Sequence, residues 1–386
     1  NSFNNWVPDL TFNVISQGLD NGTTPESTAG FDMILNSKDD RRLVVVGNFT
    51  TAAGQPFTNI AVYSDTGAIS PDGEYGTGTF TATEAPVIYS ILEVGGSYIA
   101  AGTFTSYSTA DVPAESSQFI IPIPDATTID FGSGYENLVS NIYNDGTNLF
   151  LGGGFQTYKG LSASRISKIS ATGSTDTSFV TGSGFNSTVY KYHSSGITVG
   201  TFTSYNGTSA TRIVKLTATG SIDPTFVTGT GFIDTTVESL LEDSGNIYAG
   251  LSLPLGTYDG NIVTGIVKLS ATGSIDTSFK YSEGSGFTNK VRCITKYNSG
   301  FLLSGQNLNS GSLPNGNGFN GMLLLTSTGS IDTSFIGPTV SSQNFWKSVI
   351  TNDNNILTGG DFTTYKGTTV NRIVKLSATG SIDTSF

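Results

Sequence analysis

The chain has 386 residues, a formal net charge of −12 and a pI of about 4.4. This charge disfavours a polyanion such as nucleic acid as a partner, and the lack of any apolar run near the roughly 20 residues of a membrane span argues against membrane insertion. Only 12% of the residues are charged and 48 are glycine, which favours short strands joined by tight turns.

The first predicted element is a leader strand within residues 1–12, which end in "DLTF". The same D-x-[ST]-F ending recurs at 176–179, 223–226, 276–279, 332–335 and 383–386. Because the chain stops directly after a copy, we expect the leader to join the C-terminal end in one composite unit and so close a ring. The competing interpretation is an array that continues further.

After the leader, residues 13–386 repeat one pattern. The clear D-x-[ST]-F endings lie 47 to 56 residues apart, and the 374 residues from Phe12 to Phe386 divide into seven units of about 53. Such a period is typical of repeat architectures. A second landmark, a short apolar run ending in or near glycine, also occurs seven times: "LVVVGNF" (43–49), "YIAAGTF" (98–104), "LFLGGGF" (149–155), "GITVGTF" (196–202), "IYAGLS" (247–252), "FLLSGQN" (301–307) and "ILTGGDF" (356–362).

Each unit is predicted to contain four short strands. The first is an apolar strand, such as residues 138–145, and a turn rich in Asn, Asp, Ser and Gly leads from it into the glycine-ending second strand. The third is "RIVKL", as at 212–216, where polar and apolar residues alternate. After the turn "ATGS", the segment "IDTSF" is the fourth strand or its approach. No stretch shows a convincing 3.6-residue period.

The predicted fold is therefore all-β: a seven-bladed β-propeller of four-stranded antiparallel blades, built from repeats of about 53 residues. A single blade is a thin sheet that cannot bury both of its faces. Stacking it between two neighbours buries them, and closing the ring leaves no blade with an unpartnered face.

The repeated residues are interpreted as scaffold. The glycine after the apolar run should permit a close approach of backbone, and the following Phe should fill the layer between blades. The Asp of "GSIDTSF" should accept hydrogen bonds from backbone N–H groups of its own turn. Arg165, Arg212 and Arg372 occupy one equivalent position, where we expect outward-facing strand residues.

The segment "GTFTSYNGTSATRIVKLTATGSIDPTF" (200–226) resembles the delta-60 repeat, which forms propellers in large bacterial surface proteins and in some bacteriophage proteins. The match is specific in units three, four and seven, and good in the second half of units five and six. Units one and two have degenerate endings, "TGAISPD" (66–72) and "IPDATTIDF" (123–131). The resemblance implies a propeller and carries no catalytic residues.

The sequence predicts no catalytic, cofactor-binding or metal-binding residues. His193 is the only histidine and Cys293 the only cysteine, so a zinc site lacks ligands; we expect a surface or packing role for His193 and a core position for Cys293. The run "LGGGF" (151–155) lacks the residues of a phosphate loop and is predicted to end a strand. Calcium at the turns 144–148 or 37–42 has few carboxylates to hold it.

Functional residues are expected where the repeat is broken, because the repeat itself is scaffold. The departures are residues 20–30, 108–128, 252–264, 306–321 and 337–346. Within 108–128 the prolines of "QFIIPIP" suit a strand edge or a contact arm. Trp6 and Trp346 are the only tryptophans; either could anchor an interface, although a packed aromatic is the simpler interpretation.

Two functions remain open. The first is a non-catalytic, extracellular interaction or structural module, either a bacteriophage tail or virion component or a bacterial cell-surface adhesin. Its partners would be other proteins of a larger assembly or a host or cell-surface receptor, possibly a glycan. The alternative is a carbohydrate-binding or glycan-cleaving propeller, lectin-like or sialidase-like. The ligand-binding residues are not identified by the sequence.

Overall fold

The structure, a computed structural model, describes residues 19–20, 31–35, 42–52, 55, 57–64, 68–69, 79–82, 86–108, 118–123, 129–253, 255–279, 289–306, 321–338, 344–370, 372–384 and 386. All regular secondary structure in these ranges is β-strand, so the all-β prediction is confirmed there. No described segment forms a helix of the length and apolarity that crossing a membrane requires.

Three-stranded antiparallel sheets of one topology dominate the described residues: the strand that comes second in the sequence lies in the middle. Eight sheets share this order, one of them among the smaller outer sheets described below. The other seven contain the longer strands. They are β2 (Phe31–Leu35), β3 (Leu43–Gly47) and β5 (Ile60–Tyr63); β7 (Ile88–Val94), β8 (Ser97–Gly102) and β10 (Ile120–Ile123); β11 (Val139–Asn144), β12 (Asn148–Gly153) and β15 (Ile166–Ser170); β16 (Val189–Tyr192), β17 (Ile197–Gly200) and β20 (Ile213–Lys215); β22 (Val237–Asp243), β23 (Asn246–Leu251) and β26 (Ile266–Leu269); β27 (Val291–Tyr297), β28 (Gly300–Gly305) and β29 (Met322–Leu325); β30 (Phe345–Ile350), β31 (Ile356–Gly360) and β34 (Ile373–Leu376).

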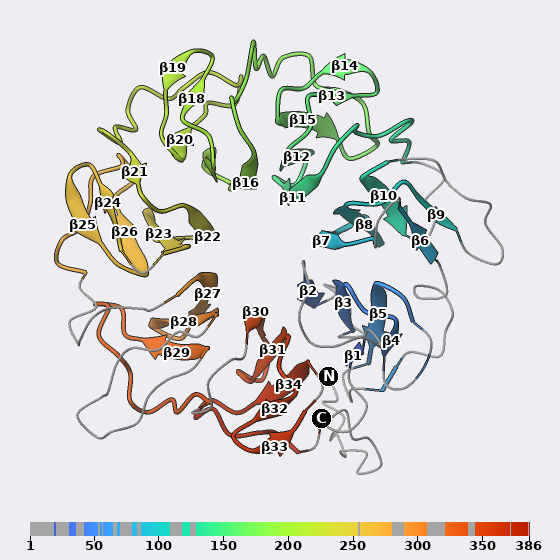
Figure 1. Cartoon of the computed structure of the whole chain (residues 1–386), viewed down its shortest axis with the longest axis vertical. Helices are drawn as coiled ribbons and strands as arrows, with labels where there is room; N and C mark the ends of the chain where they lie inside the picture. Colours follow the sequence, from blue (N-terminus) through green and yellow to red (C-terminus); the bar gives the residue numbers. More distant parts are fainter. Residues whose placement is uncertain are drawn as a thin grey trace, which may run out of the picture.

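These sheets stand around a ring, with the first strand of each nearest the centre (Figure 1). Every first strand contacts the first strand of the next sheet, and β30 contacts β2. One buried cluster contains Leu357 and Ile373 of the last sheet together with Met33 and Leu43 of the first. The ring is therefore closed by side-chain packing as well as by the course of the chain.

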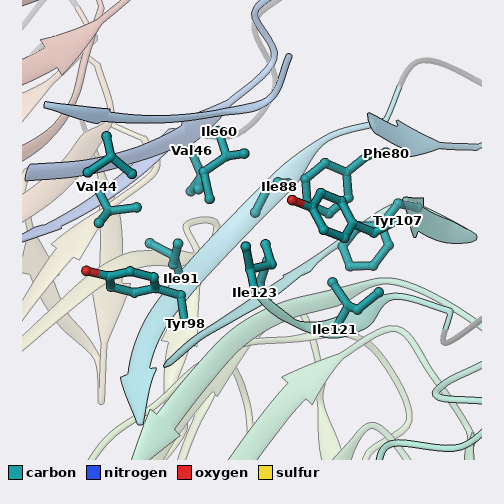
Figure 2. Packing of buried hydrophobic residues seen from close by; sticks show 13 residues of the cluster. Val44, Val46, Ile60, Phe80, Ile88, Ile91, Tyr98, Tyr107, Ile121 and Ile123 are labelled. Carbon is teal, nitrogen blue, oxygen red and sulfur yellow. The ribbon is translucent and has the colours of Figure 1, made fainter. Parts of the chain in front are cut away.

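The core lies between neighbouring sheets. Figure 2 shows Val44, Val46 and Ile60 of the first sheet facing Ile91 and Tyr98 of the second, all buried. The apolar residues of the sequence repeat thus fill layers between units, as the stacking argument requires. Burying each such side chain contributes about 1.5–3 kcal/mol.

Smaller sheets occupy the outer part of the ring (Figure 1). Several arise from "TSYNG" and its variants, to which the sequence analysis assigned no strands. Asn206 and Gly207 both have positive φ, as a two-residue hairpin turn requires. These sheets are β1 (Leu19–Asp20) with β4 (Thr51–Ala52); β6 (Thr79–Thr81) with β9 (Ser106–Ser108); β13 (Thr157–Tyr158) with β14 (Leu161–Ser162); β18 (Ser204–Tyr205) with β19 (Thr208–Ser209); β21 (Phe232–Ile233) with β24 (Gly256–Tyr258) and β25 (Asn261–Val263); and β32 (Thr364–Tyr365) with β33 (Thr368–Thr369).

The expected fourth strand is present only as isolated bridges. In the unit ending at Phe226, Leu216 pairs with Ile222, and the Asp223 N–H donates to the Lys215 carbonyl oxygen at 2.8 Å. The chain then turns back through Asp223, so the ladder ends after one pair. Equivalent bridges join Leu269 to Ile275, Leu325 to Ile331 and Leu376 to Ile382.

The predictions for the repeated glycine and aromatic residues are confirmed. A Cβ built on Gly200 would lie 2.1 Å from the Thr188 carbonyl oxygen, so only glycine fits this approach of the second strand to the start of the first. Phe202 is fully buried, with its ring centroid 4.3 Å from that of Phe185. The Tyr205 hydroxyl donates to the Gly220 carbonyl oxygen at 2.5 Å, a clamp that the sequence analysis missed.

The repeated Asp residues bind their own turns as predicted. The Ser178 N–H donates to Asp176 Oδ1 at 2.9 Å, and Lys168 Nζ of the third strand lies 2.8 Å from Asp176 Oδ2. The hydrogen bonds from Lys168 and then from the Ser178 hydroxyl lower the pKa of Asp176 to about 2. The lysine of "RIVKL" is therefore the partner of the turn carboxylate, a pairing that the sequence analysis did not anticipate.

The prediction for the repeated arginines is wrong. Arg165, Arg212 and Arg372 have positive φ and precede the third strand instead of belonging to it. Arg212 Nη1 donates to the Phe232 carbonyl oxygen of the next unit at 2.5 Å; Arg165 reaches Phe185 in the same way. Arg165 and Arg212 therefore link neighbouring units, and Arg372 is buried at the equivalent position, so none of the three faces outward.

Several predictions fall outside the described residues. These are the leader 1–12 with Trp6, the turn at 37–41, and most of the non-repeating segments 20–30, 108–128 and 306–321. Of 108–128, the structure describes β10, which lies at the outer edge of its sheet and contains Pro122. The predicted strand edge is confirmed there. Proline has no N–H to donate, and on an edge strand no further strand needs that donor.

Candidate functional site

The first strand of each sheet is an edge strand that faces the centre of the ring, so its inward backbone groups have no partner strand. We call seven equivalent residues on these strands the inner ring. In each sheet, the inner-ring residue on the first strand pairs with the penultimate residue of the second strand. Asn141, for example, is opposite Gly152 in a second strand that ends at Gly153. The inner ring consists of Asp32, Ser90, Asn141, Lys191, Ser239, Cys293 and Lys347.

Side chains of the inner ring satisfy the exposed backbone of the next strand. Ser90 Oγ accepts a hydrogen bond from the Ile142 N–H at 3.3 Å. Asn141 Oδ1 accepts one from the Tyr192 N–H at 2.9 Å. These residues lie about one repeat apart in sequence, so the contacts join successive units through the edge that would otherwise be unpaired.

Two charged members of the inner ring, Asp32 and Lys347, connect the first sheet to the last. Asp32 Oδ2 accepts a hydrogen bond from the Ile91 N–H at 3.2 Å, while Asp32 Oδ1 lies 3.0 Å from Lys347 Nζ. Asp32 thus connects the first sheet to the second and to the last. The attraction of Asp32 raises the pKa of Lys347 against the opposing effect of burial.

Lys191 departs from this pattern, because an ammonium group cannot accept a backbone N–H. It has no hydrogen bond or ion pair with any described residue. Burial, and then the neighbouring Lys347, lowers its pKa, while Asp32 and Glu238 oppose the shift. Lys347 and Asp32 lie on β30 and β2, on the other side of the ring from β16, whereas Glu238 lies on the neighbouring strand β22 (Figure 1).

A second set of side chains begins one residue earlier, at the bulge near the start of most first strands. Tyr190, Glu238, Arg292 and Trp346 occupy this position on four successive strands and are half-buried. Arg292 Nη1 lies 3.5 Å from Glu238 Oε2, and its guanidinium carbon lies 3.9 Å from the centre of the Trp346 ring. Burial lowers the pKa of Arg292, with Glu238 and Asp361 opposing.

Polar atoms near this set are only partly paired. Arg292 Nε is buried and has no acceptor among the described residues, whereas the Trp346 indole N–H lies close enough to the Asp361 carboxyl to lower its pKa. Asn344 Nδ2 donates to Asp361 Oδ2 at 3.1 Å. Burial raises the pKa of Asp361, against the hydrogen bond from Asn344. A buried donor without an acceptor is costly, so the Arg292 guanidinium is incompletely satisfied by the described residues.

His193 lies at the opposite end of its strand, before a turn, as predicted. Its Nδ1 is 3.0 Å from Glu242 Oε1, and Ser195 Oγ donates to the same oxygen at 2.5 Å. A catalytic triad needs the nucleophile at the other ring nitrogen, and no described serine lies there. Burial of Glu242 is outweighed by its bonds to His193 and Ser195, which lower its pKa. The Ser194 hydroxyl also lies 3.1 Å from His193 Nδ1, so it shares the nitrogen that Glu242 contacts and does not complete a triad.

Of the other predicted positions, one belongs to the inner ring and the rest lie apart from it. Cys293 is buried, as expected, and belongs to the inner ring. The "LGGGF" run ends β12, also as expected. Asp145 is held within its turn by the N–H groups of Thr147 and Asn148. Within the described ranges, no group of three or more His, Cys, Asp or Glu side chains gathers where a metal ion could bind.

The inner ring was missed by the sequence analysis, although one signal for it exists. In the aligned first strands, one position has Asp or Lys in three units and Ser, Asn or Cys in the other four. The position before it has Glu238 and Arg292 in two units and Tyr, Ser or Trp in four others. A charged residue that interrupts an apolar strand in only some repeats marks a departure inside the repeat itself.

The family comparison supports a β-propeller. The model "Domain of unknown function (DUF5122) beta-propeller" matches residues 148–179, 197–226, 255–279 and 351–386. All four matched segments contain an outer hairpin, a third strand and a D-x-[ST]-F turn, and three of them also contain the second strand. No curated protein matches the chain.

Several solved structures are similar at low identity. The extracellular domain of a one-component system from B. thetaiotaomicron is 13% identical, with a TM-score of 0.49; the alignment covers 93% of this chain and 40% of that chain. A computationally designed protein, Ika8, is 12% identical at a TM-score of 0.46, covering 95% and 89%. A chain of the mitotic checkpoint complex is 12% identical at a TM-score of 0.47, covering 93% and 95%. Similarity at this level says nothing about activity or partners.

Proposed function

We propose that the chain is a non-catalytic extracellular interaction module, either a bacteriophage tail or virion component or a bacterial cell-surface adhesin. Its scaffold would be a seven-bladed propeller of four-stranded blades made from delta-60 repeats, with the leader closing the ring. The seven larger sheets of one topology and the packing of the last sheet on the first support this architecture. Its partner would be a protein, on the outer face of unit five (residues 227–279).

An exposed apolar surface in unit five carries the proposal. In the sheet β21–β24–β25, Ile233 is opposite Thr257 and Thr257 is opposite Ile262. Residues opposite one another in a sheet point to the same side, and Ile262 is 75% exposed. Leu253 and Leu255, which lead into β24, are 48% and 60% exposed. We call Ile233, Leu253, Leu255 and Ile262 the unit-five patch.

The same positions are polar in unit four (residues 180–226). The row there consists of Asn186, Ser204 and Ser209: the Asn186 N–H donates to the Ser204 carbonyl oxygen, and Ser204 is opposite Ser209. The scaffold therefore does not require isoleucine at these sites. Apolar residues that gather where a repeat is otherwise polar are typical of an interaction surface.

The lack of catalytic activity is part of the proposal. The turn carboxylates are occupied by their own turns and by lysines of the third strand, as Asp223 is by Thr225 and Lys215. The Nδ1 atom of His193 contacts both Glu242 and the Ser194 hydroxyl, so the carboxylate and the serine share one ring nitrogen instead of lying on opposite sides of the imidazole as in a triad. These arrangements favour a scaffold over a reaction centre.

A second candidate is glycan binding at the inner face. Tyr89, Tyr190 and Trp346 place half-buried aromatic rings at equivalent positions of three first strands. Sugar rings stack on such side chains, and Arg292 adds a donor of hydrogen bonds beside Trp346. A glycan array with the Trp346→Ala variant separates this candidate from the first.

The main test measures binding of the fluorescently labelled chain to intact cells by flow cytometry. The cells are chosen from the genes that lie beside the gene for this chain. If those genes encode virion proteins, the cells are the phage host; if they encode a secretion system, the cells are those that a surface adhesin would meet. The double variant Ile233→Asn/Ile262→Ser gives unit five the residues of unit four, and Leu161→Ser, at an exposed site in β14, is the matched control. We expect that treating the cells with protease abolishes binding of the labelled chain. Among the variants, only the double variant should bind the untreated cells more weakly.

Three results would contradict the proposal. Equal binding of the double variant and the control would remove the unit-five patch from the interface. Loss of binding after periodate oxidation of cell-surface glycans, with no effect of protease, would favour the glycan candidate. Turnover of a glycan by the purified chain would contradict the non-catalytic assignment.

A further inference from the structure

We propose that the partner adds a β-strand to the open edge of β25, so that the sheet β21–β24–β25 gains a fourth strand. This inference rests on the proposed function, in which a protein binds the unit-five patch, and it states how that protein is held. The edge consists of backbone groups at Ile262, so it can be tested separately from the apolar side chains of the patch.

Unit five has the widest hairpin sheet in the outer part of the ring. β24 pairs with β21 on one side and with β25 on the other, so β25 is an edge strand, and no described strand lies beyond it. The equivalent hairpins of units three, four and seven form two-stranded sheets with two residues in each strand, whereas β24 and β25 have three each. A longer edge offers more backbone to an added strand.

The backbone of Ile262 points away from β24. Hydrogen-bonded and non-hydrogen-bonded pairs alternate along an antiparallel ladder. In unit four the Ala210 N–H donates to the Thr203 carbonyl oxygen at 3.0 Å, so the preceding residue, Ser209, belongs to a non-hydrogen-bonded pair. Ile262 is opposite Thr257 at the equivalent position. Its N–H and C=O therefore face outward, and neither has a hydrogen bond with a described residue.

The side chains at this edge suit the addition of a strand. Isoleucine favours extended backbone, and the Ile262 side chain is 75% exposed. Ile233, Thr257 and Ile262 form one row across the sheet, which an apolar residue of an added strand would continue and cover. Ser209 has the same open backbone in unit four without an apolar row, so that unit provides the matched reference.

Charge selects the kind of partner. Asp234 follows β21, and Asp259 lies in the turn between β24 and β25, so exposed carboxylates stand at both ends of the sheet. Asp259 Oδ1 accepts a hydrogen bond from the Thr230 N–H at 3.4 Å. The sequence has no lysine or arginine between Lys215 and Lys268, so unit five supplies no cation beside these two carboxylates. Lysine or arginine on the partner would complement them.

The same charges disfavour a second copy of this chain as the occupant. Two copies paired through β25 would bring the carboxylates of Asp234 and Asp259 from both copies to one interface, without a cation from either sheet. The net charge of −12 on each chain adds to this repulsion. The occupant is therefore a strand of another protein, with apolar residues on one face and lysine or arginine at its ends.

The test titrates the fluorescently labelled chain on the intact cells that the main test uses, with three single variants. Ile262→Pro removes the outward N–H, a change that an edge strand tolerates because no neighbouring strand needs that donor. Ile262→Ala keeps the N–H and leaves less apolar side chain than proline does. Ser209→Pro makes the same backbone change in unit four and is the control. We expect Ile262→Pro to bind at least about fivefold more weakly than Ile262→Ala, and the control to bind like the original chain.

A further variant tests the charge of the partner. Asp234→Ser/Asp259→Asn gives unit five the residues of unit four at both sites. It should bind the cells more weakly than the original chain does, and added salt should reduce this difference, because salt screens exposed charges.

A measurement on the free chain keeps the test independent of how well the proline variants fold. Amide hydrogen exchange, followed by mass spectrometry with residue-level fragmentation, should show the Ile262 N–H exchanging as fast as that of Ser209. The Val263 N–H, which faces β24, should exchange more slowly. Slow exchange at Ile262 would show that the edge is already covered and would overturn the proposal.

The variants distinguish failure of this inference from failure of the proposed function. If Ile262→Ala binds as weakly as Ile262→Pro, the side chain alone accounts for the loss; strand addition is then wrong and the unit-five patch stands. Unchanged binding by every variant would remove the patch as well. A dimer of the purified chain that Ile262→Pro dissociates would assign the edge to a second copy and overturn the choice of partner.

Discussion

Units four and five have the same internal framework and different surfaces. Tyr205 and Tyr258 each donate a hydrogen bond to the glycine carbonyl of their own "ATG" turn, at 2.5 and 2.6 Å. Lys215 and Lys268 each pair with the turn carboxylate, at 3.1 and 2.7 Å. The two units thus fold around one set of contacts that lie within the unit.

The differences concern the contacts that point away from the unit. Unit five has Gly265 where unit four has Arg212, so it lacks the arginine link to the next unit. It also has Ile262 in place of Ser209 on the outer hairpin. Internal contacts and external contacts can therefore change separately, which explains how one repeat could carry a specific surface without losing its fold.

The largest expected effect comes from the internal framework. A Cβ at Gly200 would overlap the Thr188 carbonyl oxygen, whereas one at Gly207 would meet nothing within 4 Å. We predict that Gly200→Ala lowers the free energy of unfolding by about 3 kcal/mol, because the strands must separate. Gly207→Ala should cost about 1–2 kcal/mol, for its positive φ alone. Urea unfolding followed by tryptophan fluorescence measures both.

An equal loss in the two glycine variants would show that backbone conformation, and not the close approach, determines the choice of glycine in this repeat. A loss for Gly207→Ala alone would contradict the packing described for the second strand.

An intermediate effect is expected for the link between units. Arg212→Gly gives unit four the residue of unit five and removes the bond from Nη1 to the Phe232 carbonyl oxygen. We predict a loss of about 1–2 kcal/mol in the free energy of unfolding, reduced by relief of the positive φ at Arg212. Gly265→Ala, at an unlinked position, is the reference, and urea unfolding again provides the measurement. A stabilised Arg212→Gly variant would mean that the arginine link contributes nothing.

The sequence predicts well what each unit repeats. The glycine at 200, the aromatic at 202 and the turn carboxylate at 223 have their expected roles because each acts within a few residues of its own unit. Repetition also reveals the order of the strands, since the same apolar run returns at every period.

The side-chain contacts between neighbouring units could not be predicted from the sequence. Ser90 bonds the backbone of Ile142, and Asn141 bonds that of Tyr192; these pairs depend on how the sheets stack around the ring. The error for Arg212 has the same origin, because its left-handed backbone is set by the bend before the third strand. The unit-five patch required the register of β21, β24 and β25, which no sequence pattern specified.

The smallest effect concerns a feature that both units retain, the pairs formed by Asp223 and Asp276. Hydrogen bonds from the Thr225 hydroxyl and backbone N–H, and then from Lys215, lower the pKa of Asp223 to about 2; those from Lys268 and then the Ser278 hydroxyl do the same for Asp276. An unfolded Asp has a pKa near 3.9. Since the folded pKa is the lower one, the stabilisation is fully present above about pH 4 and is lost as the pH falls toward 2.

We therefore predict that the double variant Asp223→Asn/Asp276→Asn is less stable than the original chain at pH 6, and that this difference shrinks at pH 3. The change should be small and should weaken with added salt, because both carboxylates are near the surface. Asp234→Asn, at an exposed site without a bond to any described residue, is the control. Urea midpoints at the two pH values decide the matter: a difference that stays constant with pH would assign the role of these residues to turn geometry, with no contribution from their charge.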